Sequence, residues 1–412
     1  MNFRTLLRTL GPGLLYAGAA VGVSHLVQST RAGASYGFEL LWVVIAANVI
    51  KYPFFEFAPR YATATGNSLI EGYRKIGKWA VWIFVLLTVS TMFILQAAVT
   101  VVTAALFGNI FGITLNSNAI AAIILIFTMF VLMSGKFSAL DKMIKVIIIT
   151  LTITTIIAVI SAFDLSPREA GSFDWFNAVD IAFLIALVGW MPAPIDLSTW
   201  HSTWTVAKRK ESGHKESLKE SLFDFNFGYI GTAFLAGGFV ALGAFVMNGS
   251  GQQFSAKGGE FAAQLIDMYT SSLGNWAYWI IAIAALTTMF STTITVLDAY
   301  PRVLQPATEI LFPALKPKKK TSLFPYSFWM IVTIGGTLAI LVYFSQSMRF
   351  MVDLATTISF VSAPILAVLN YKAVTHPQFP VEARPKKWLL IYAWLGILFL
   401  SLFSIFYLIW RF

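Results

Sequence analysis

Helix-breaking and polar residues interrupt two long apolar stretches of this 412-residue sequence. The first interruption is residues 22–25 (Gly-Val-Ser-His), and the second is residues 191–194 (Met-Pro-Ala-Pro). Such residues are tolerated at membrane depth only where the backbone is buried in protein or lines a polar cavity. Two interruptions of this kind are typical of a transporter that binds its substrate near the bilayer midplane. The residues predicted to bind that substrate are Gly22, Ser24, His25, Met191, Ala193, Pro194, Asp196 and Thr199.

The side chains at the two interruptions favour an anion over a metal cation. A divalent cation prefers anionic oxygen or imidazole ligands, and near the interruptions only His25, Met191 and Asp196 could bind a metal. The N-terminal ends of half-helices near Ser24 and Pro194 favour negative charge. A small anion whose oxygens accept hydrogen bonds from backbone N–H groups and from the nearby hydroxyls and imidazole is therefore the better match.

The elements that position these residues are transmembrane helices. Hydrophobic residues make up 58% of the chain and charged residues 12%, whereas a soluble domain carries about 25% charged residues. A helix needs about 20 apolar residues to cross a bilayer, so the sequence predicts an all-α polytopic membrane protein with eleven transmembrane helices and no soluble domain. Their predicted bounds are 11–33, 37–60, 79–107, 117–135, 143–163, 178–200, 225–248, 275–300, 324–345, 348–371 and 388–410.

Basic residues are concentrated in alternate loops. The loops after even-numbered helices are rich in Lys and Arg, whereas the loop between helices 5 and 6 is acidic. By the positive-inside rule, the N-terminus is cytoplasmic and the C-terminus lies outside, in a multi-pass protein of the plasma (inner) membrane. These loops account for the formal charge of +10, so the lipid bilayer is the predicted partner and no nucleic acid is. The absence of cysteine excludes disulfides and thiolate metal sites.

The predicted helices divide into two groups of five. Helices 1–5 (about 11–163) and helices 6–10 (about 178–371) each begin with an interrupted helix, which predicts an inverted repeat. The predicted transporter core is residues 1–372, and residues 373–412 contain helix 11. Residues 201–221 are predicted to form a short cytoplasmic helix between helices 6 and 7. The sequence does not specify an oligomeric state, and a monomer is consistent with it.

Several runs along the chain resemble the Nramp family of metal transporters. The resemblance covers nearly the whole chain and keeps the family's spacing. It implies a transporter rather than an enzyme, with the LeuT-type architecture, a 5+5 inverted repeat in which helices 1 and 6 are unwound around a central site. The residues that carry the resemblance are 11–15 (Gly-Pro-Gly-Leu-Leu), 32–38 (Ala-Gly-Ala-Ser-Tyr-Gly-Phe), 40–44 (Leu-Leu-Trp-Val-Val), 64–66 (Ala-Thr-Gly), 191–192 (Met-Pro), 273–274 (Leu-Gly) and 291–295 (Ser-Thr-Thr-Ile-Thr).

The chain departs from the family where the family binds its metal. The family's Asp-Pro-Gly-Asn motif aligns with residues 22–25, and its Met-Pro-His motif has Ala193 in place of His. The acidic residues of the family's helix 3 are absent, and Gly237 and Thr356 replace an Asn in helix 7 and a Gln in helix 10. Of the usual Nramp ligands only Met191 is retained. This pattern predicts a divergent Nramp-related branch with a changed substrate.

Bicarbonate is the preferred substrate, since a small hydrated monoanion fits a pocket descended from an ion site. Two alternatives stay open. The first is a transporter of a divalent metal cation (manganese, iron or magnesium) with a rebuilt site of His25, Met191 and Asp196. The second is a non-transporting membrane sensor. No cofactor is predicted apart from sodium as a coupling ion.

Sodium coupling is predicted from a cluster of hydroxyl residues in helix 8. In LeuT-type proteins such hydroxyls, with backbone carbonyls from the unwound part of helix 1, hold one sodium ion. The same residue types also join transmembrane helices without binding any ion. The residues predicted to hold sodium are Ala19, Gly22, Ser291, Thr292 and Thr295.

Charged residues within the predicted spans have structural or gating interpretations. Arg31 is predicted either to attract anions into an outer vestibule or to snorkel to the interface. Lys51 is predicted to snorkel or to form a structural ion pair, with Glu56 as a fair helical partner. Asp298 and Arg302 are spaced i,i+4 at the cytoplasmic end of helix 8, where they form a structural pair or a gate.

Overall fold

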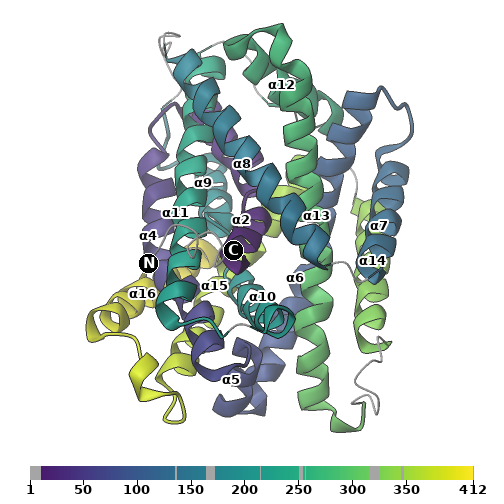
Figure 1. Ribbon diagram of the computed structural model, residues 1–412. Helices are drawn as coiled ribbons and strands as arrows, with labels where there is room; N and C mark the ends of the chain where they lie inside the picture. The colour runs from purple at the N-terminus through teal and green to yellow at the C-terminus, as the bar shows by residue number, and fades with distance from the viewer. Residues whose placement is uncertain are drawn as a thin grey trace.

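The structure, a computed structural model, is helical throughout the part of the chain that it describes, with no β-strand there (Figure 1). The long helices pack side by side as a bundle. The all-α prediction is therefore confirmed. The described residues are 11–134, 137–163, 172–213, 215–249, 254–255, 257–315, 324–344 and 348–411.

The first predicted transmembrane helix is broken, as expected. Its first half is α2 (Pro12–Ala20), in which proline occupies the first turn, where its missing N–H costs no helical hydrogen bond. The backbone leaves helical geometry at Gly22. It then re-forms a helix as η1 (Val23–Ser29), which is wound as a π-helix, and continues without a gap into α3 (Thr30–Tyr36).

The sixth predicted helix is broken as well. α9 (Ala178–Trp190) and α10 (Leu197–Ser212) are separated by residues 191–196, and the Met191–Pro192 peptide bond is cis. Proline lacks the N–H that a continuing helix would donate, so α9 ends at this point. The two breaks divide helices 1 and 6 into half-helices whose ends lie inside the protein.

Each of the other predicted spans is occupied by a helix, and further short helices lie between the spans. Seven helices are long and apolar enough to cross a membrane by length and composition, and three shorter apolar helices accompany them in the described residues. The number of eleven crossings stays a prediction. The helices are α4 (Leu41–Thr65), α5 (Leu69–Ile76), α6 (Lys78–Phe111), α7 (Ser117–Met133), α8 (Phe137–Ala162), α11 (Leu218–Leu242), η2 (Gly243–Met247), α12 (Gly258–Leu273), η3 (Asn275–Ala277), α13 (Tyr278–Leu311), η4 (Pro313–Leu315), α14 (Phe324–Phe344), α15 (Met348–Thr375), η5 (Val381–Ala383) and α16 (Lys387–Arg411).

The prediction of a separate cytoplasmic helix over residues 201–221 is wrong. Residues up to Ser212 continue α10, and α11 begins at Leu218. Ser217 and Glu220 form a reciprocal capping box at that start, so each satisfies a backbone N–H of the other. The alternating Lys and Glu residues therefore belong to the ends of two different helices, a division that charge periodicity alone does not reveal.

Half-helix α2 is held against α11 by a carboxylate and by two glycines. The carboxylate of Asp224 accepts hydrogen bonds from the backbone N–H groups of Gly11, at 3.0 Å, and Gly13, at 2.6 Å. A Cβ atom on Gly13 would lie 2.1 Å from the carbonyl oxygen of Asp224, and one on Gly228 would lie 2.2 Å from that of Gly13. Only glycine allows the two backbones to approach this closely, and the contact fixes where helix 1 breaks.

Candidate substrate-binding site

A small cavity lies between the two breaks. Its volume is about 20 Å³, enough for about one water molecule. Of the predicted site residues, Ala19, Ser24, Pro194 and Thr292 line it. All twelve lining residues are Ala19, Ala20, Val23 and Ser24 of helix 1, Trp190, Pro194, Leu197 and Trp200 of helix 6, Leu95 and Val99 of α6, and Thr292 and Val296 of α13.

The imidazole of His25 is turned towards α11 and does not line this cavity. Its Nε2 lies 3.0 Å from the carbonyl oxygen of Thr232, and its Nδ1 lies 2.7 Å from the hydroxyl of Ser24. That hydroxyl also lies 2.7 Å from the carbonyl oxygen of Ala20. Because a carbonyl only accepts, Nε2 is the donor to Thr232. The single Ser24 proton then serves two acceptors, unless Nδ1 carries a proton and donates to Ser24.

Lys51 of α4 is the functional candidate that sequence reasoning missed. Its fully buried ammonium group donates to the carbonyl oxygens of Val188 at 2.7 Å and Gly189 at 2.8 Å, and it lies 3.4 Å from that of Ala193. These carbonyls belong to the C-terminal end of α9, which carries the negative end of the helix dipole. The position of Lys51 near the middle of a predicted span indicated that its ammonium needs a partner. The sequence does not reveal which helix supplies that partner.

The pairing of Lys51 with Glu56 and the snorkelling of its side chain are both wrong. The carboxylate of Glu56 binds Arg60 instead, at 2.5 Å, and the ammonium of Lys51 does not snorkel because it lies in the core. The amine thus acts as a tethered cation inside the break of helix 6. It takes the position that a free cation would need in order to bind these carbonyls.

Asp196 lies at the start of α10, the opposite end of the same break. Its side chain is buried and interacts electrostatically with Lys51. Its Oδ1 atom accepts no hydrogen bond from the described part of the chain. A carboxylate at a helix N-terminus is stabilised by the helix dipole, so each half-helix end at this break is compensated by a charge of the protein itself.

The other predicted residues of helix 6 are buried beside the cavity. Thr199 donates its hydroxyl to the carbonyl oxygen of Asp196 at 2.6 Å, within its own helix. The Met191 side chain is fully buried, and Ala193 contributes its carbonyl to Lys51. These contacts lie within helix 6 or join it to Lys51.

Of the predicted sodium residues, Thr292 reaches helix 1, at carbonyls one position earlier than those predicted. The Thr292 hydroxyl lies 3.2 Å from the carbonyl oxygen of Gly18 and 3.3 Å from that of Val21, rather than reaching those of Ala19 and Gly22. A Cβ on Gly22 would lie 2.7 Å from the Thr292 side chain, so this glycine lets helix 1 pack closely on α13.

Oxygen atoms outnumber protons in this cluster. The Thr292 hydroxyl also lies 3.1 Å from the carbonyl oxygen of Thr288, so three carbonyls compete for one hydroxyl proton. Nearby on α13, Thr295 donates within its own helix, and the buried Ser291 hydroxyl has no partner among the described residues. A set of oxygens with too few protons is suited to a hard cation.

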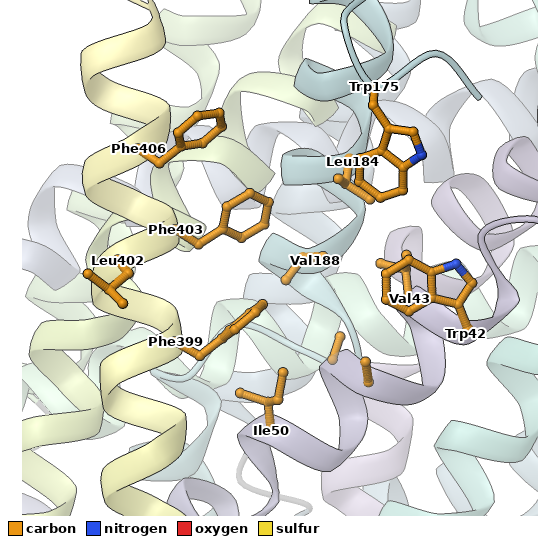
Figure 2. A pocket seen from close by; sticks show the side chains of 12 residues that line it. Trp42, Val43, Ile50, Trp175, Leu184, Val188, Phe399, Leu402, Phe403 and Phe406 are labelled. Carbon is orange, nitrogen blue, oxygen red and sulfur yellow. The ribbon is translucent and has the colours of Figure 1, made fainter.

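A larger apolar cavity lies away from the breaks, between α4, α9 and α16. It measures about 450 Å³, and Figure 2 shows Trp42 and Trp175 on one side of it, across from Phe399, Phe403 and Phe406 of α16. Its twelve lining residues are all apolar. An inorganic ion would find no polar side chain there, so this cavity is not the ion site despite its size.

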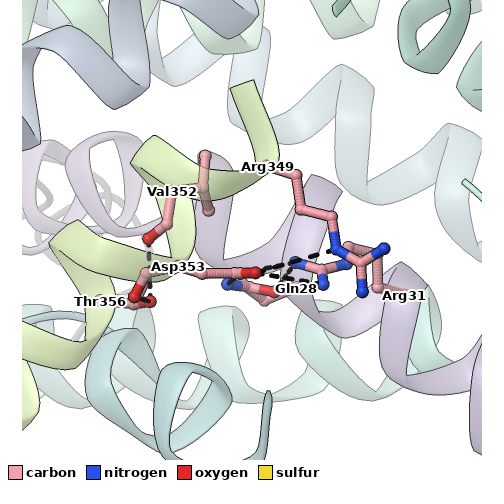
Figure 3. A network of polar contacts seen from close by, with 6 residues as sticks. All are labelled: Gln28, Arg31, Arg349, Val352, Asp353 and Thr356. Carbon is pink, nitrogen blue, oxygen red and sulfur yellow. Dashed lines mark hydrogen bonds and ion pairs between the residues drawn. The ribbon is translucent and has the colours of Figure 1, made fainter. Parts of the chain in front are cut away.

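Arg31 joins helix 1 to α15 instead of reaching the surface. Its guanidinium binds the carboxylate of Asp353 at 2.7 Å, and Gln28 bonds to both side chains (Figure 3). The ring of Phe183 covers the guanidinium, with 4.9 Å between the charge and the ring centroid. Because Arg31 is only 6% exposed, the snorkelling interpretation is wrong. Arg31 does line a cavity of about 730 Å³ together with Arg349 and Asp353.

Asp298 forms the predicted contact with Arg302, at 2.5 Å. The same carboxylate accepts a hydrogen bond from the Tyr326 hydroxyl at 2.7 Å and one from the Trp204 indole at 3.4 Å. Asp298 therefore links α13 to α14 and to α10, the second half of broken helix 6. Its role as a gate stays a prediction.

Comparisons with known proteins agree with this geometry. A family model described as "Natural resistance-associated macrophage protein-like", Nramp, matches residues 13–410. An uncharacterized protein of Pasteurella multocida is 39% identical over 96% of this chain and 90% of its own length. A divalent metal cation transporter, MntH, of Yersinia pestis is 25% identical over 70% of both chains.

Solved structures share the fold at low sequence identity. A manganese transporter of Eremococcus coleocola, crystallised with an aromatic bis-isothiourea compound, superposes with a TM-score of 0.72 at 14% identity, over 98% of this chain and 86% of that one. MhsT in complex with L-phenylalanine gives a TM-score of 0.66 at 15% identity, over 98% of both chains. These likenesses establish a LeuT-type fold. Because the family model covers nearly the whole sequence, the chain belongs to the Nramp family of multi-pass membrane transporters.

Proposed function

We propose that this chain is a secondary transporter of a small inorganic anion, with bicarbonate as the preferred substrate. Family membership supports the secondary transport of a small inorganic ion. The observation that carries the choice of an anion is the ammonium of Lys51, buried in the break of helix 6 on the carbonyls of Val188 and Gly189. A divalent cation that entered the break would meet a fixed positive charge at these ligands.

The donor set around the breaks also supports an anion. Within the described residues no group of three or more His, Asp or Glu side chains is arranged to hold a metal. Asp196 already neutralises the start of α10, so the anion is proposed to bind at the start of the continuous helix η1–α3. Val23 and Ser24 line the cavity there, and the first N–H groups of a helix lack intrahelical acceptors.

A divalent metal cation is the second candidate. The Eremococcus coleocola neighbour is a manganese transporter and the Yersinia relative is named for divalent metal transport. In this chain the unpartnered Oδ1 of Asp196 is the feature that favours a cation. A non-transporting sensor, the third candidate, would bind its ion without moving it across the membrane.

Uptake into proteoliposomes separates these candidates. We expect uptake of ¹⁴C-bicarbonate at mildly alkaline pH, where bicarbonate is the dominant species, and no uptake of ⁵⁴Mn²⁺ by the same vesicles. Protein-free liposomes control for the diffusion of carbon dioxide. Manganese uptake without bicarbonate uptake would establish the second candidate, and ion binding with no flux of either would establish the sensor.

Sodium is the proposed coupling ion, held by Thr292 with the carbonyls of Gly18 and Val21. Moving a charge against the membrane potential costs about 2.3 kcal/mol per 100 mV, and co-transport of a sodium ion with a monoanion removes this cost. We expect Thr292→Val to abolish the sodium dependence of uptake. Thr288→Val is the matched control, because among the described residues the Thr288 hydroxyl bonds only to Ala284 in its own helix. Uptake that is unchanged when choline replaces sodium would refute the coupling.

The internal symmetry and the topology are part of the same proposal. Residues 11–163 and 178–371 form an inverted repeat, and the broken helix at the start of each half supports this division. The N-terminus is proposed to be cytoplasmic and the C-terminus to lie outside the plasma (inner) membrane, as the loop charges favour.

A further inference from the structure

The 730 Å³ cavity beside Arg31 is a groove along α15, and most of its lining is apolar. Five side chains at helical spacing form one stripe of that helix, and the groove is walled by α6, α9 and α16. The stripe and its adjoining arginine cover about 24 Å at 1.5 Å per residue, whereas the hydrocarbon of one bilayer leaflet is about 15 Å thick. The stripe consists of Phe350, Leu354, Ile358, Val361 and Ile365.

The groove opens onto the surface of the protein. Phe350 is 54% exposed at one end of the stripe, and Ile365 is 43% exposed at the other. Because the surface around a transmembrane bundle is covered by hydrocarbon, an apolar groove that opens onto it is filled by an acyl chain rather than by water. The groove is therefore continuous with the protein's lipid contact surface.

A positive charge lies at the Phe350 end of the stripe. The Arg349 Nε lies 3.9 Å from the Asp353 carboxylate, and its guanidinium donates no hydrogen bond within the part of the chain that the structure describes. Asp353 is already engaged by Arg31 at 2.7 Å (Figure 3). Two guanidinium groups thus share one carboxylate, which leaves a net charge of about +1 and most of the Arg349 donors available.

We propose that an anionic phospholipid binds this groove, with its phosphate at Arg349 and one acyl chain along the α15 stripe. A phospholipid satisfies both halves of the site at once, since its phosphate accepts the guanidinium hydrogens and its chain covers the apolar stripe. A free inorganic anion would use only the polar end. The apolar cavity in Figure 2 offers no such charge. The proposal does not depend on which ion is transported.

Native mass spectrometry of the detergent-purified protein tests this assignment. With phosphatidylglycerol and phosphatidylcholine of identical chains at equal concentration, we expect the wild type to bind phosphatidylglycerol about fivefold more tightly, as one basic residue near anionic lipid provides. Arg349→Gln should abolish this preference, and Arg349→Lys should keep it. Lys372→Gln, which removes a charge near the other end of α15, is the matched control and should behave as the wild type.

Two further measurements keep the test decisive. Leu354→Trp narrows the groove while leaving Arg349 in place, and it should weaken phosphatidylglycerol binding if the chain lies along the stripe. Inorganic phosphate should not displace the lipid.

Equal binding of both lipids by the wild type would overturn the proposal. Displacement by inorganic phosphate would also overturn it, in favour of a site for a small free anion. Melting temperatures without added lipid should match for Arg349→Gln and the wild type, because Arg349 is half exposed.

Discussion

Lys51→Met is expected to destabilise the protein by about 3–5 kcal/mol, the usual result of removing one partner of a buried charge pair. The substitution removes the donor to the carbonyl of Gly189 and leaves the carbonyl of Val188 with only the Met191 N–H, at 3.4 Å. It also leaves the charge of Asp196 without its compensating cation. Each unsatisfied buried carbonyl adds about 1–3 kcal/mol of desolvation cost. Denaturation in detergent micelles, followed by circular dichroism, measures the change.

The double variant Lys51→Met/Asp196→Asn tests whether the two charges are coupled. Removing both should be less destabilising than the sum of the single changes, by about 0.5–3 kcal/mol. Lys372→Met removes a lysine from the exposed end of α15 and is the control for loss of charge alone. If Lys51→Met unfolds at the same denaturant concentration as the wild type, the role assigned to the ammonium is wrong.

The same double variant separates stability from transport. If Lys51 only supports the break, a double variant that folds should still take up the substrate. If the ammonium provides the positive field that attracts an anion, uptake of bicarbonate should stay lost although the fold is recovered. Uptake by proteoliposomes that contain equal amounts of folded protein distinguishes the two outcomes.

Gly228→Ala is expected to disrupt the packing of half-helix α2 on α11 and to abolish transport. Its new Cβ would lie 2.2 Å from the carbonyl oxygen of Gly13, a distance that only a backbone shift can relieve. Overpacking of this kind costs about 1–3 kcal/mol or more, and the shift would also disturb the bonds from Asp224 to Gly11 and Gly13. Thermal stability in micelles and uptake by proteoliposomes measure both effects.

Gly231→Ala is the matched control on the same helix. A Cβ on Gly231 would meet no atom within 4 Å, so this variant should keep transport and gain up to about 1 kcal/mol from the higher helix propensity of alanine. If the close approach of α2 and α11 requires glycine at position 228, the two variants differ. Equal tolerance of alanine at both positions would contradict it.

Helix positions followed well from the sequence because each crossing needs a long apolar stretch. The breaks at residues 22–25 and 191–194 also followed, since glycine and proline act on their own backbone. The amphipathic helices α5 and α12 were missed, because they are too polar or too short to resemble a crossing. The division of residues 201–221 between α10 and α11 depends on the cap at Ser217, a local feature that the charge pattern obscured.

Side-chain partners were predicted less well. Glu56 was the nearest acid to Lys51 along α4, yet Glu56 binds Arg60 and Lys51 binds helix 6. No partner was predicted for Arg31, which binds Asp353, more than 300 positions away in the chain. An ionisable residue in a helix reveals that a partner is needed, and the partner can lie on any helix that the fold brings near.

By itself, the sequence determined the membrane class, the two breaks and the departure from the family's metal motif, because these depend on composition and on residues adjacent in the chain. Only the tertiary structure decided where the charges at the breaks go. It directs His25 to α11, places Lys51 on the carbonyl end of α9, and sets Asp196 at the start of α10. The physical reason is that a buried charge is stable only beside a compensating group. Which group lies beside it depends on how helices that are distant in the sequence pack together.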